Sequence, residues 1–423
     1  MRARIVAGGV VFVALIAAGI VISGLFDPDY ETSGVDQAAA TQEVIARGKY
    51  LAKAGDCTAC HTSKEGAPFA GGVPIPTPFG TIYGTNITPD KTHGIGNWTS
   101  ADFYKAVHDG IAPDHPLYPA MPYTTYRGMT REDSDAIFAY LQSVRPVSVP
   151  NQNNEVPFPF NLRPLLRGWN LLFLRDTLPD VSSGSSAQWV RGRYVTNALG
   201  HCTECHTPRG KLGQLQLRHT FQGGNLGGIQ GPDITPAALA ARGWSVQALQ
   251  QFLATGIAPQ GSAYGEMFDA FHHSTQYLTE QDNKAMVRYL TGDKPADPTP
   301  LAMAASGGEG LTAGRRHYLA LCAGCHAAGG QGKPNVTVAL VGNSTVRNVN
   351  SNNLLQVMLH GITAKQFPGN QGRQAMPGFA DSLNDAQIAE LANYLRTSFG
   401  GQKGNVQAAD VQASRKASRK AAP

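Results

Sequence analysis

The chain has 423 residues, a formal net charge of +5 and 42% hydrophobic residues, a composition that excludes a wholly disordered protein. Only 15% of its residues are charged, and its 48 glycines and 27 prolines disfavour coiled coils and long helical bundles. Its length, about three times that of the commonest domain, predicts several domains. Apart from a short Lys/Arg pattern at the C-terminus the sequence has no clustered basic stripe, so we expect no nucleic-acid partner.

The first predicted element is an uncharged segment at the N-terminus. Arg2 and Arg4 precede 22 uncharged residues, Ile5–Phe26. Secretory signals have an apolar region of about 7–15 residues, whereas a membrane-spanning helix needs about 20. We therefore expect residues 1–26 to form an uncleaved anchor, with a cleaved signal as the alternative. The positive-inside rule places the rest of the chain on the periplasmic side of a bacterial inner membrane.

All six cysteines lie in three Cys-x-x-Cys-His pentapeptides, namely Cys57–His61, Cys202–His206 and Cys322–His326. This pattern is typical of c-type haem attachment, in which both thiols bind the haem and the histidine is an axial ligand of the iron. The sequence therefore predicts three haem c groups. The expected covalent attachment residues are Cys57, Cys60, Cys202, Cys205, Cys322 and Cys325, and the expected iron ligands are His61, His206 and His326.

Other uses of paired cysteines fit this pattern less well. A disulfide framework would have varied spacings and would not place a histidine after each pair. A structural zinc site needs four ligands, and three identical pairs cannot be divided evenly among such sites. Thioredoxin-like dithiols need a βαβ pattern that this sequence lacks.

The three motifs lie in a repeated layout of predicted helices. A helical stretch with basic residues and a tyrosine precedes each motif, and an apolar helical run ending in Gly-Ile follows it. A closing helix with Tyr-Leu completes each unit. The expected stop signals of the apolar runs are Gly110, Gly256 and Gly361. The expected N-caps of the closing helices are Thr130, Thr279 and Asn384. This layout is that of a small class I cytochrome c, so we expect an all-α fold with three tandem cytochrome c domains.

A methionine follows each Gly-Ile pair in what we expect to be a Gly/Pro-rich loop between two helices. Their recurring position makes Met121, Met267 and Met376 the expected sixth ligands of the three irons. We expect the other candidates, Met129, Met286 and Met358, to be core residues. His272 and His273 closely follow Met267 and leave ligation of the second iron by two histidines as an alternative. Six-coordinate His/Met iron suits electron transfer rather than catalysis.

The segments between these units complete the predicted organisation. We expect cytochrome c domains at residues 42–147, 186–294 and 310–399, an apolar connector at 148–185, a linker at 295–309 and a disordered basic tail at 400–423. The apolar part of the connector, Leu162–Leu174, is too short to span a membrane. We expect it to be an interfacial helix or a docking surface for a partner, with burial against the haem domains as the alternative.

Four segments carry a resemblance to a known family. They are residues 68–90 (PFAGGVPIPTPFGTIYGTNITPD), 117–123 (LYPAMPY), 157–173 (PFPFNLRPLLRGWNLLF) and 273–279 (HSTQYLT). Together they resemble the tri-haem cytochrome c subunit of membrane-bound periplasmic dehydrogenases, the enzymes that act on alcohols, gluconate or sorbitol. The resemblance extends from about Ala46 to Phe399.

The resemblance implies an electron-transfer subunit with no catalytic residues of its own, and it implies the same haem ligands that the motifs indicate. A large partner subunit with PQQ, flavin or molybdopterin would oxidise a CH-OH or aldehyde substrate. The three haems would then pass the electrons to membrane ubiquinone or the respiratory chain. The alternatives are a free-standing membrane-anchored multihaem carrier and the cytochrome subunit of a molybdenum-dependent aldehyde dehydrogenase.

Overall fold

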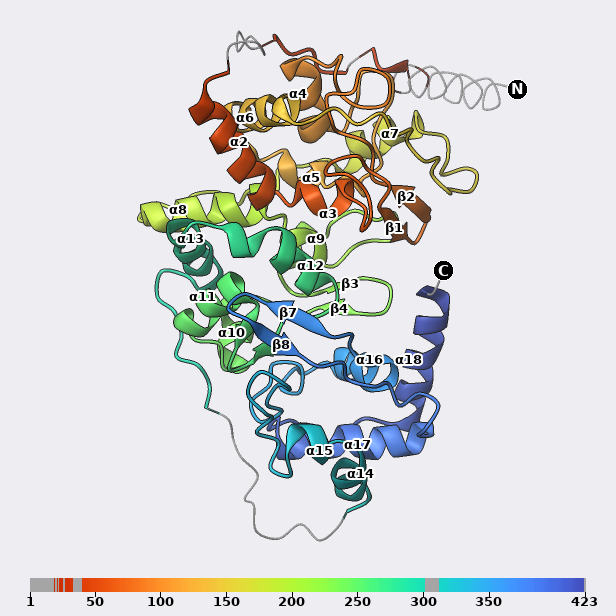
Figure 1. Cartoon of the computed structure of the whole chain (residues 1–423), viewed down its shortest axis with the longest axis vertical. Helices are drawn as coiled ribbons and strands as arrows, with labels where there is room; N and C mark the ends of the chain where they lie inside the picture. Colours follow the sequence, from red (N-terminus) through yellow and green to blue (C-terminus); the bar gives the residue numbers. More distant parts are fainter. Residues whose placement is uncertain are drawn as a thin grey trace, which may run out of the picture. The chain divides into compact units, whose positions relative to one another are not determined.

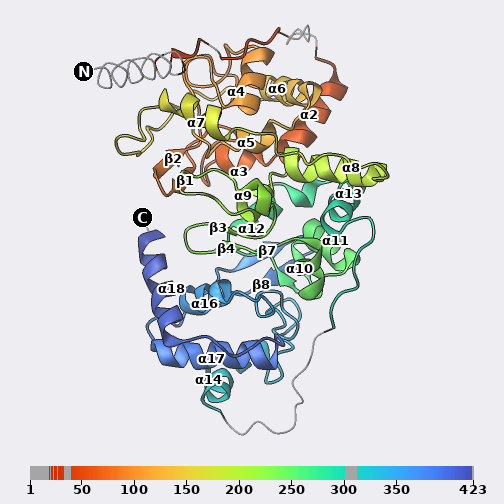
Figure 2. The ribbon, with the colours of Figure 1, turned by 180° about the vertical axis from the view of Figure 1, so that it is seen from behind.

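This computed structural model consists of helices connected by irregular loops and short hairpins (Figures 1 and 2). It describes residues 19, 21, 23–25, 27–32, 40–300 and 312–421. The chain divides into two compact units. The first comprises Met1–Asp180 with Asn197–His201, and the second comprises Val181–Thr196 with Cys202–Pro423. The first unit thus holds one Cys-x-x-Cys-His segment and the second holds two, while the three domain boundaries given above stay predictions.

The first unit begins its helical part at Thr41, whose hydroxyl caps the first described long helix. Its helices are α2 (Gln42–Ala54), α3 (Cys57–His61), α4 (Ser100–Asp109), α5 (Tyr123–Tyr126), α6 (Arg131–Ser143) and α7 (Leu165–Phe173). Its strands are β1 (Pro74–Thr77) and β2 (Gly80–Tyr83). At the start of α4, Thr99 and Asp102 form a capping box, which satisfies two backbone N–H groups that a helix leaves without partners.

The second unit contains two successive sets of helices. The first set is α8 (Ala187–Tyr194), a π-helical turn (Val195–Leu199) whose last three residues belong to the first unit, α9 (Thr203–His206), α10 (Pro236–Ala241), α11 (Val246–Thr255), α12 (Glu266–His273) and α13 (Glu280–Thr291). The second set is α14 (Ala313–Leu321), α15 (Ala323–His326), α16 (Asn352–His360), α17 (Asp385–Ser398) and α18 (Ala408–Ala421). Short 3₁₀ turns lie at Leu217–His219 and Thr275–Tyr277.

The helix start and stop signals read from the sequence are confirmed. The predicted N-caps each accept a hydrogen bond from the backbone N–H three residues further on, at Thr130 (3.2 Å), Thr279 (3.1 Å) and Asn384 (3.0 Å). The predicted stops have φ values of +68°, +72° and +73°, at Gly110, Gly256 and Gly361. These backbone angles favour glycine because it has no Cβ to clash.

A close helix crossing occurs three times, between α2 and α6, α8 and α13, and α14 and α17. At each crossing the first helix contributes a glycine on which a Cβ would lie 1.8–2.3 Å from a backbone carbonyl oxygen of the second. The glycine–carbonyl pairs are Gly48–Ala136, Gly192–Ala285 and Gly314–Glu390. Because no side chain fits there, the same residue type recurs in all three segments and fixes how closely the helices pack.

Four two-stranded antiparallel sheets join the helices in the described part of the chain, and the expected all-α fold did not include them. They pair β1 with β2, β3 (Gly224–Asn225) with β4 (Gln230–Gly231), β5 (Ile257–Ala258) with β6 (Gly261–Ser262), and β7 (Lys365–Phe367) with β8 (Gln371–Arg373). Strands of two to four residues are too short to show the alternating pattern on which strand prediction depends.

The two helix sets of the second unit share a polar interface. Ser344 accepts hydrogen bonds from the Arg242 guanidinium (3.2 Å) and the Trp244 indole (3.1 Å), and its own N–H donates to the Gln260 carbonyl (2.8 Å). The β7–β8 hairpin also reaches across, because Phe367 packs against Phe271 and Phe268 of α12. The residues from Cys202 onward therefore belong to one compact unit.

The expectation of a disordered tail is wrong, because residues 408–421 form helix α18. Val411 is fully buried in the core of the preceding helices, and Arg415 bonds to Asp385 (2.7 Å) and to the Leu383 carbonyl (2.7 Å). Figure 2 shows α18 beside α16 and α17, which it also contacts. The tail is charged and rich in alanine, and so few of its residues are buried that its sequence shows no clear apolar stripe.

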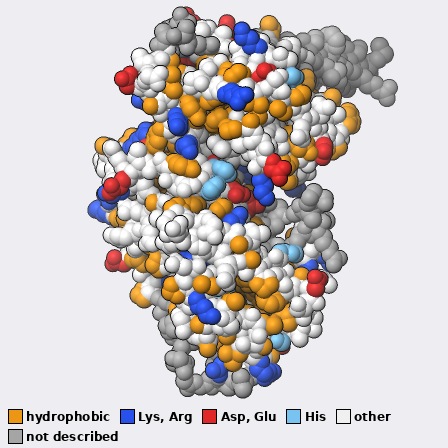
Figure 3. All heavy atoms as spheres, in the orientation of Figure 1, with side chains coloured by type: hydrophobic (Ala, Val, Ile, Leu, Met, Phe, Trp, Pro, Cys, Tyr) orange, Lys and Arg blue, Asp and Glu red, His pale blue; other side chains and the backbone are white. Residues whose placement is uncertain are grey.

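Helix α7 occupies the middle of the predicted connector, and none of its residues is buried. Leu165, Leu171 and Leu172 are exposed and the other residues of the helix are half-buried, so α7 packs partly against its own unit. Both predictions for the connector stay predictions. Figure 3 shows hydrophobic side chains at the surface of the chain on one face, with lysines and arginines scattered among them.

Most of the predicted anchor Ile5–Phe26 lies outside the described residues, which include only 19, 21 and 23–25 of it. Within the part of the chain that the structure describes, no helix combines the length and the hydropathy needed to cross a bilayer. The linker 295–309 is described up to residue 300, and there the Thr299 N–H bonds to the Ala240 carbonyl at 2.8 Å.

Candidate haem-binding sites

Each Cys-x-x-Cys-His motif forms a short helical turn, in α3, α9 and α15. Helical geometry places residues three and four apart on one face, so both thiols and the imidazole of a motif lie on the same side. None of the six cysteines forms a disulfide, which excludes the disulfide framework. The motif geometry therefore suits two covalent bonds and one axial bond to the same planar group.

The histidine of each motif is held in the same tautomer by a backbone carbonyl. The Nδ1–H of His61 donates to the Thr85 carbonyl (2.6 Å), that of His206 to the Pro232 carbonyl (2.7 Å) and that of His326 to the Val338 carbonyl (3.0 Å). Because a carbonyl oxygen only accepts, Nδ1 must carry the proton and Nε2 keeps its lone pair. Burial lowers the pKa of all three imidazoles and so favours the neutral form that binds metals.

Burial also determines the state of the first cysteine of each motif. It raises the pKa of Cys57 and Cys202 to about 12 and that of Cys322 to about 11. Catalytic dithiols have a lowered thiol pKa, because the thiolate is the nucleophile in disulfide exchange. These values disfavour a redox-dithiol function for the three pairs.

The first and second sites each have a loop that passes close to their own motif. A Cβ on Gly84 would lie 1.7 Å from the Cys60 carbonyl oxygen, and one on Gly231 would lie 2.1 Å from the Cys205 carbonyl oxygen. The NITP and DITP segments that follow these glycines have matching turns, in which Asn86 and Asp233 accept from the N–H and the hydroxyl two residues later. The third segment has neither NITP nor DITP.

The three expected methionine ligands are all half-buried, but their local structures differ. Met121 lies in the loop between α4 and α5, as expected. Met376 also lies in a loop, where its backbone pairs with Ile362 (2.9 and 3.0 Å). Met267 does not lie in a loop, because the loop ends at Gly265 and the methionine is the second residue of α12.

Two of these methionines border the same apolar cluster as the first cysteine of their motif. Met267 and Cys202 both pack against the cluster that contains Leu249 and Leu253, and Met376 packs against the cluster that contains Cys322. The competing methionines are core residues, as expected, with exposed fractions of 5%, 1% and 1% for Met129, Met286 and Met358. His272 is exposed and stacks on Phe268 (5.5 Å), an arrangement that favours Met267 as the sixth ligand.

A buried arginine beside the second site was not identified from the sequence. Arg242 is 5% exposed, and its guanidinium donates to the Asp233 carbonyl (2.5 Å), next to the Pro232 carbonyl that binds His206. Burial, the largest cause, and the positive charge of Arg347 together lower the pKa of Arg242 to about 10, although the Asp233 carboxylate acts in the opposite direction. The corresponding stretch of the first segment, between NITP and Trp98, contains no arginine, and this difference is the signal that a comparison of the repeats offers.

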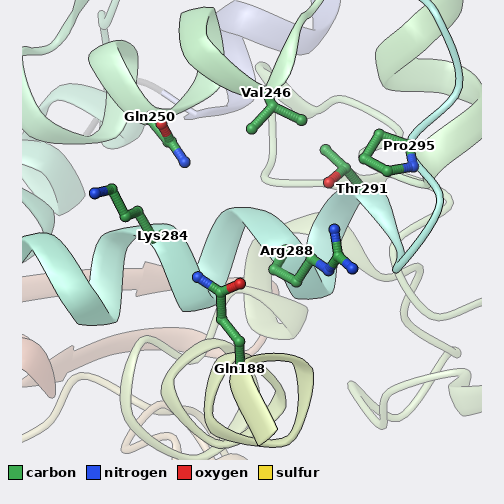
Figure 4. A pocket seen from close by; sticks show the side chains of 7 residues that line it. All are labelled: Gln188, Val246, Gln250, Lys284, Arg288, Thr291 and Pro295. Atoms are coloured by element: carbon green, nitrogen blue, oxygen red, sulfur yellow. The ribbon is translucent and has the colours of Figure 1, made fainter. Parts of the chain in front are cut away.

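A small cavity of about 120 Å³ lies between α8, α11 and α13 in the second unit (Figure 4). Polar side chains line much of it, among them Lys284, paired with Glu280, and Arg288, paired with Asp293. None of the expected haem ligands lines this cavity, so it does not belong to the sites described above.

The residues present fit covalently bound haem at each motif. Each offers two cysteines outside any disulfide, one helical turn apart, and a neutral imidazole with an unprotonated Nε2. The donor set of imidazole nitrogen and thioether sulfur is one that haem iron accepts in electron-transfer proteins.

Comparisons with known proteins agree with this geometry. The family model named cytochrome c matches residues 45–145 and 311–399. The fructose dehydrogenase cytochrome subunit of Gluconobacter japonicus is 38% identical over 89% of this chain and 83% of its own length. The cytochrome c subunit of an alcohol dehydrogenase (quinone) of Gluconacetobacter polyoxogenes is 36% identical over 88% of this chain and 84% of its own. A nicotinate dehydrogenase subunit of Pseudomonas putida is 39% identical over 85% of this chain, which spans only 31% of that relative.

Proposed function

Because this chain belongs to the cytochrome c subunits of membrane-bound dehydrogenases, which transfer electrons, we propose that it carries three haem c groups and passes electrons from its dehydrogenase partner to membrane ubiquinone. We place it on the periplasmic side of the bacterial inner membrane, where the N-terminal segment Ile5–Phe26 would anchor it. The axial pairs are His61 with Met121, His206 with Met267 and His326 with Met376.

The observation that carries this proposal is the threefold repetition of one ligand geometry. At each motif the imidazole, buried at His61 and His326 and half-buried at His206, donates its Nδ1–H to a backbone carbonyl and leaves Nε2 for a metal. Outer hydrogen bonds of this kind fix the orientation and tautomer of metal-binding histidines. The second motif lies outside both ranges matched by the cytochrome c model, and it nevertheless has the same geometry.

The proposed mechanism needs no substrate chemistry on this chain. A bound haem would supply a one-electron couple at each site. The carbonyl of Thr85, Pro232 or Val338 orients the imidazole of its motif and would keep Nε2 directed at the iron. Met121, Met267 and Met376 would help to hold the haems, and a thioether ligand would raise the reduction potential.

The partner that we propose is a large dehydrogenase subunit with PQQ, flavin or molybdopterin that oxidises a CH-OH or aldehyde substrate. The named relatives serve dehydrogenases for fructose, alcohol and nicotinate, so one cytochrome family accompanies several substrates. The second candidate, a cytochrome subunit of a molybdenum-dependent aldehyde dehydrogenase, is the narrower case in which the partner holds molybdopterin and acts on an aldehyde. Co-purification of the membrane complex and identification of the large subunit's cofactor test it, because PQQ or flavin in that subunit would exclude this narrower case.

The test of the proposal is a haem count followed by electron transfer. A pyridine haemochrome titration of the purified chain is expected to give three haems, and replacing both cysteines of one motif by serine is expected to give two. The isolated complex, given the partner's substrate, is expected to reduce all three haems and then a soluble ubiquinone analogue. Two haems or fewer in the unmodified chain, or haems that the substrate does not reduce, would contradict it.

A further inference from the structure

Helix α7 exposes three of its four leucines, whereas its polar Asn170 points toward the rest of the first unit. Asn170 faces the first unit, where its amide donates to the Asp109 carbonyl (2.9 Å) and accepts from the Tyr123 hydroxyl (2.8 Å). Leu171 and Leu172 are 64% and 62% exposed. A surface helix in water normally has the opposite arrangement, with its apolar stripe toward the core.

The chain before α7 extends this exposed apolar surface. We define the α7 patch as the six exposed hydrophobic residues Phe158, Phe160, Leu162, Leu165, Leu171 and Leu172, each of which is at least 45% exposed. Nothing lies within 4 Å of the position where Gly168, in the middle of the helix, would carry a Cβ. Apolar side chains gathered in this way on a soluble surface mark a site of contact with a protein or a membrane.

An ion pair brings the end of the N-terminal uncharged segment to this helix. Asp27, the first residue after Ile5–Phe26, binds Arg167 of α7 through Nη2 (2.7 Å) and Nε (2.9 Å). Nearby, Leu25 is 73% exposed. A further hydrogen bond, from the Tyr30 hydroxyl to Asp109 (2.8 Å), holds the following residues on the first unit.

From these contacts we propose that the α7 patch rests in the surface of a phospholipid bilayer and forms a second membrane contact beside the N-terminal segment. The inference rests on the membrane location given under the proposed function. A segment of 22 uncharged residues is long enough to span the bilayer, and the Asp27–Arg167 pair sets its end against α7. The helix itself has nine residues, too few to span, so it lies in the plane of the interface.

Two arginines beside the patch have a charge opposite to that of an anionic lipid surface. Arg163 precedes α7 and stacks on the Tyr118 ring (5.0 Å), and Arg175 follows the helix and is exposed. Arginines at the edges of an apolar patch keep their guanidinium groups among the headgroups and are attracted to anionic lipids. A bilayer therefore fits both the apolar face and the arginines near its ends.

The experiment is photo-crosslinking of the full-length haem-loaded chain in vesicles of phosphatidylethanolamine and phosphatidylglycerol that contain a phospholipid with a diazirine on its acyl chain. Peptide mass spectrometry is expected to find labels between residues 158 and 172. The double variant L171Q/L172Q is expected to reduce labelling of that peptide at least tenfold without changing the haem spectrum. The matched control L212Q, at a leucine that is 50% exposed in the other unit, is expected to leave it unchanged.

The other outcomes are equally definite. Labels in 5–26 alone would overturn the inference, and so would labels at 158–172 that disappear when the dehydrogenase partner is bound, because the patch would then be a protein interface. Labels at 158–172 in a chain that has lost residues 1–26 would support the patch and refute the anchor. A chain with three haems and no labels would refute the membrane location and leave electron transfer untouched.

Discussion

At the scale of single residues, the second site differs from the first in its electrostatics. Arg242 is buried and binds the peptide carbonyl next to the one that holds His206. Burial, the main cause, lowers the pKa of His206, and the positive charge of Arg242 contributes to this shift. A ferric haem carries one more positive charge than a ferrous one, so a fixed cation nearby favours the reduced form. We therefore expect the second haem to have a raised reduction potential.

The variant Arg242→Gln removes this charge. One of the three reduction potentials is expected to fall by about 59 mV. For a one-electron couple, this fall changes the ratio of oxidised to reduced haem about tenfold at a fixed applied potential. A spectroelectrochemical titration measures all three couples. The matched control Arg288→Gln, at a half-buried arginine paired with Asp293, is expected to leave them unchanged. If all three potentials move together in Arg242→Gln, the charge does not act locally.

The methionines allow a ligand test against a core residue of the same type. Met121→Ala, Met267→Ala and Met376→Ala are each expected to remove about one third of the long-wavelength band of ferric His/Met haem and to lower one potential. Met286→Ala is the control, since this side chain is 1% exposed in the core. It is expected to destabilise the fold by about 2–5 kcal/mol and to keep the band. A silent Met267→Ala combined with a spectral change in His273→Ala would assign the second iron two histidines.

At the scale of elements, the glycine crossings show what local sequence can and cannot reveal. The caps at Thr130, Thr279 and Asn384 could be predicted, because a cap depends on residues three positions apart. The need for Gly48 could not, since it arises from the Ala136 carbonyl far along the chain. The carbonyls that bind the haem-motif histidines lie 24, 26 and 12 residues beyond them, so spacing rules did not reveal them either.

Gly192→Ala tests the crossing of α8 and α13. The added methyl group would lie 1.8 Å from the Ala285 carbonyl oxygen, so the helices must separate. The expected cost is about 1–3 kcal/mol of unfolding free energy, or more, measured by thermal or denaturant unfolding. Gly168→Ala in α7 is the control, because its Cβ meets nothing within 4 Å. That variant is expected to be neutral or to stabilise by about 0.5–1 kcal/mol, since alanine favours helix. Equal effects of the two variants would show that helix propensity, not packing, decides.

At the scale of the whole chain, the second and third haem motifs belong to one unit. Buried Phe367, from the hairpin of the third segment, packs on Phe268 and Phe271 of α12. The same helix holds Met267 in its first turn. The repeat in the sequence predicted the three similar segments. It did not predict this contact, because a pattern that repeats within each segment carries no information about contacts between segments.

Phe367→Ala tests whether the third segment supports the second site. The vacated space is expected to cost about 3–5 kcal/mol of stability, to loosen α12 and to alter the methionine band and potential of the second haem. Phe379→Ala, in the core of the third segment, is the control and is expected to leave the second haem unchanged. The same optical titration measures both. An unchanged second haem in a folded Phe367→Ala protein would show that the hairpin contact does not reach the ligand.

The carbonyl partners of the three histidines also have a consequence for proton traffic. An imidazole whose Nδ1–H faces a peptide oxygen has no base beside it that could take up a proton when the iron changes its charge. Oxidation of a CH-OH group releases two protons with its two electrons, and the proximal side of each haem would carry only the electrons. In the proposed complex, the protons would therefore leave from the partner subunit into the surrounding medium. Only at the quinone would electrons and protons meet again, on whichever side of the membrane supplies the protons.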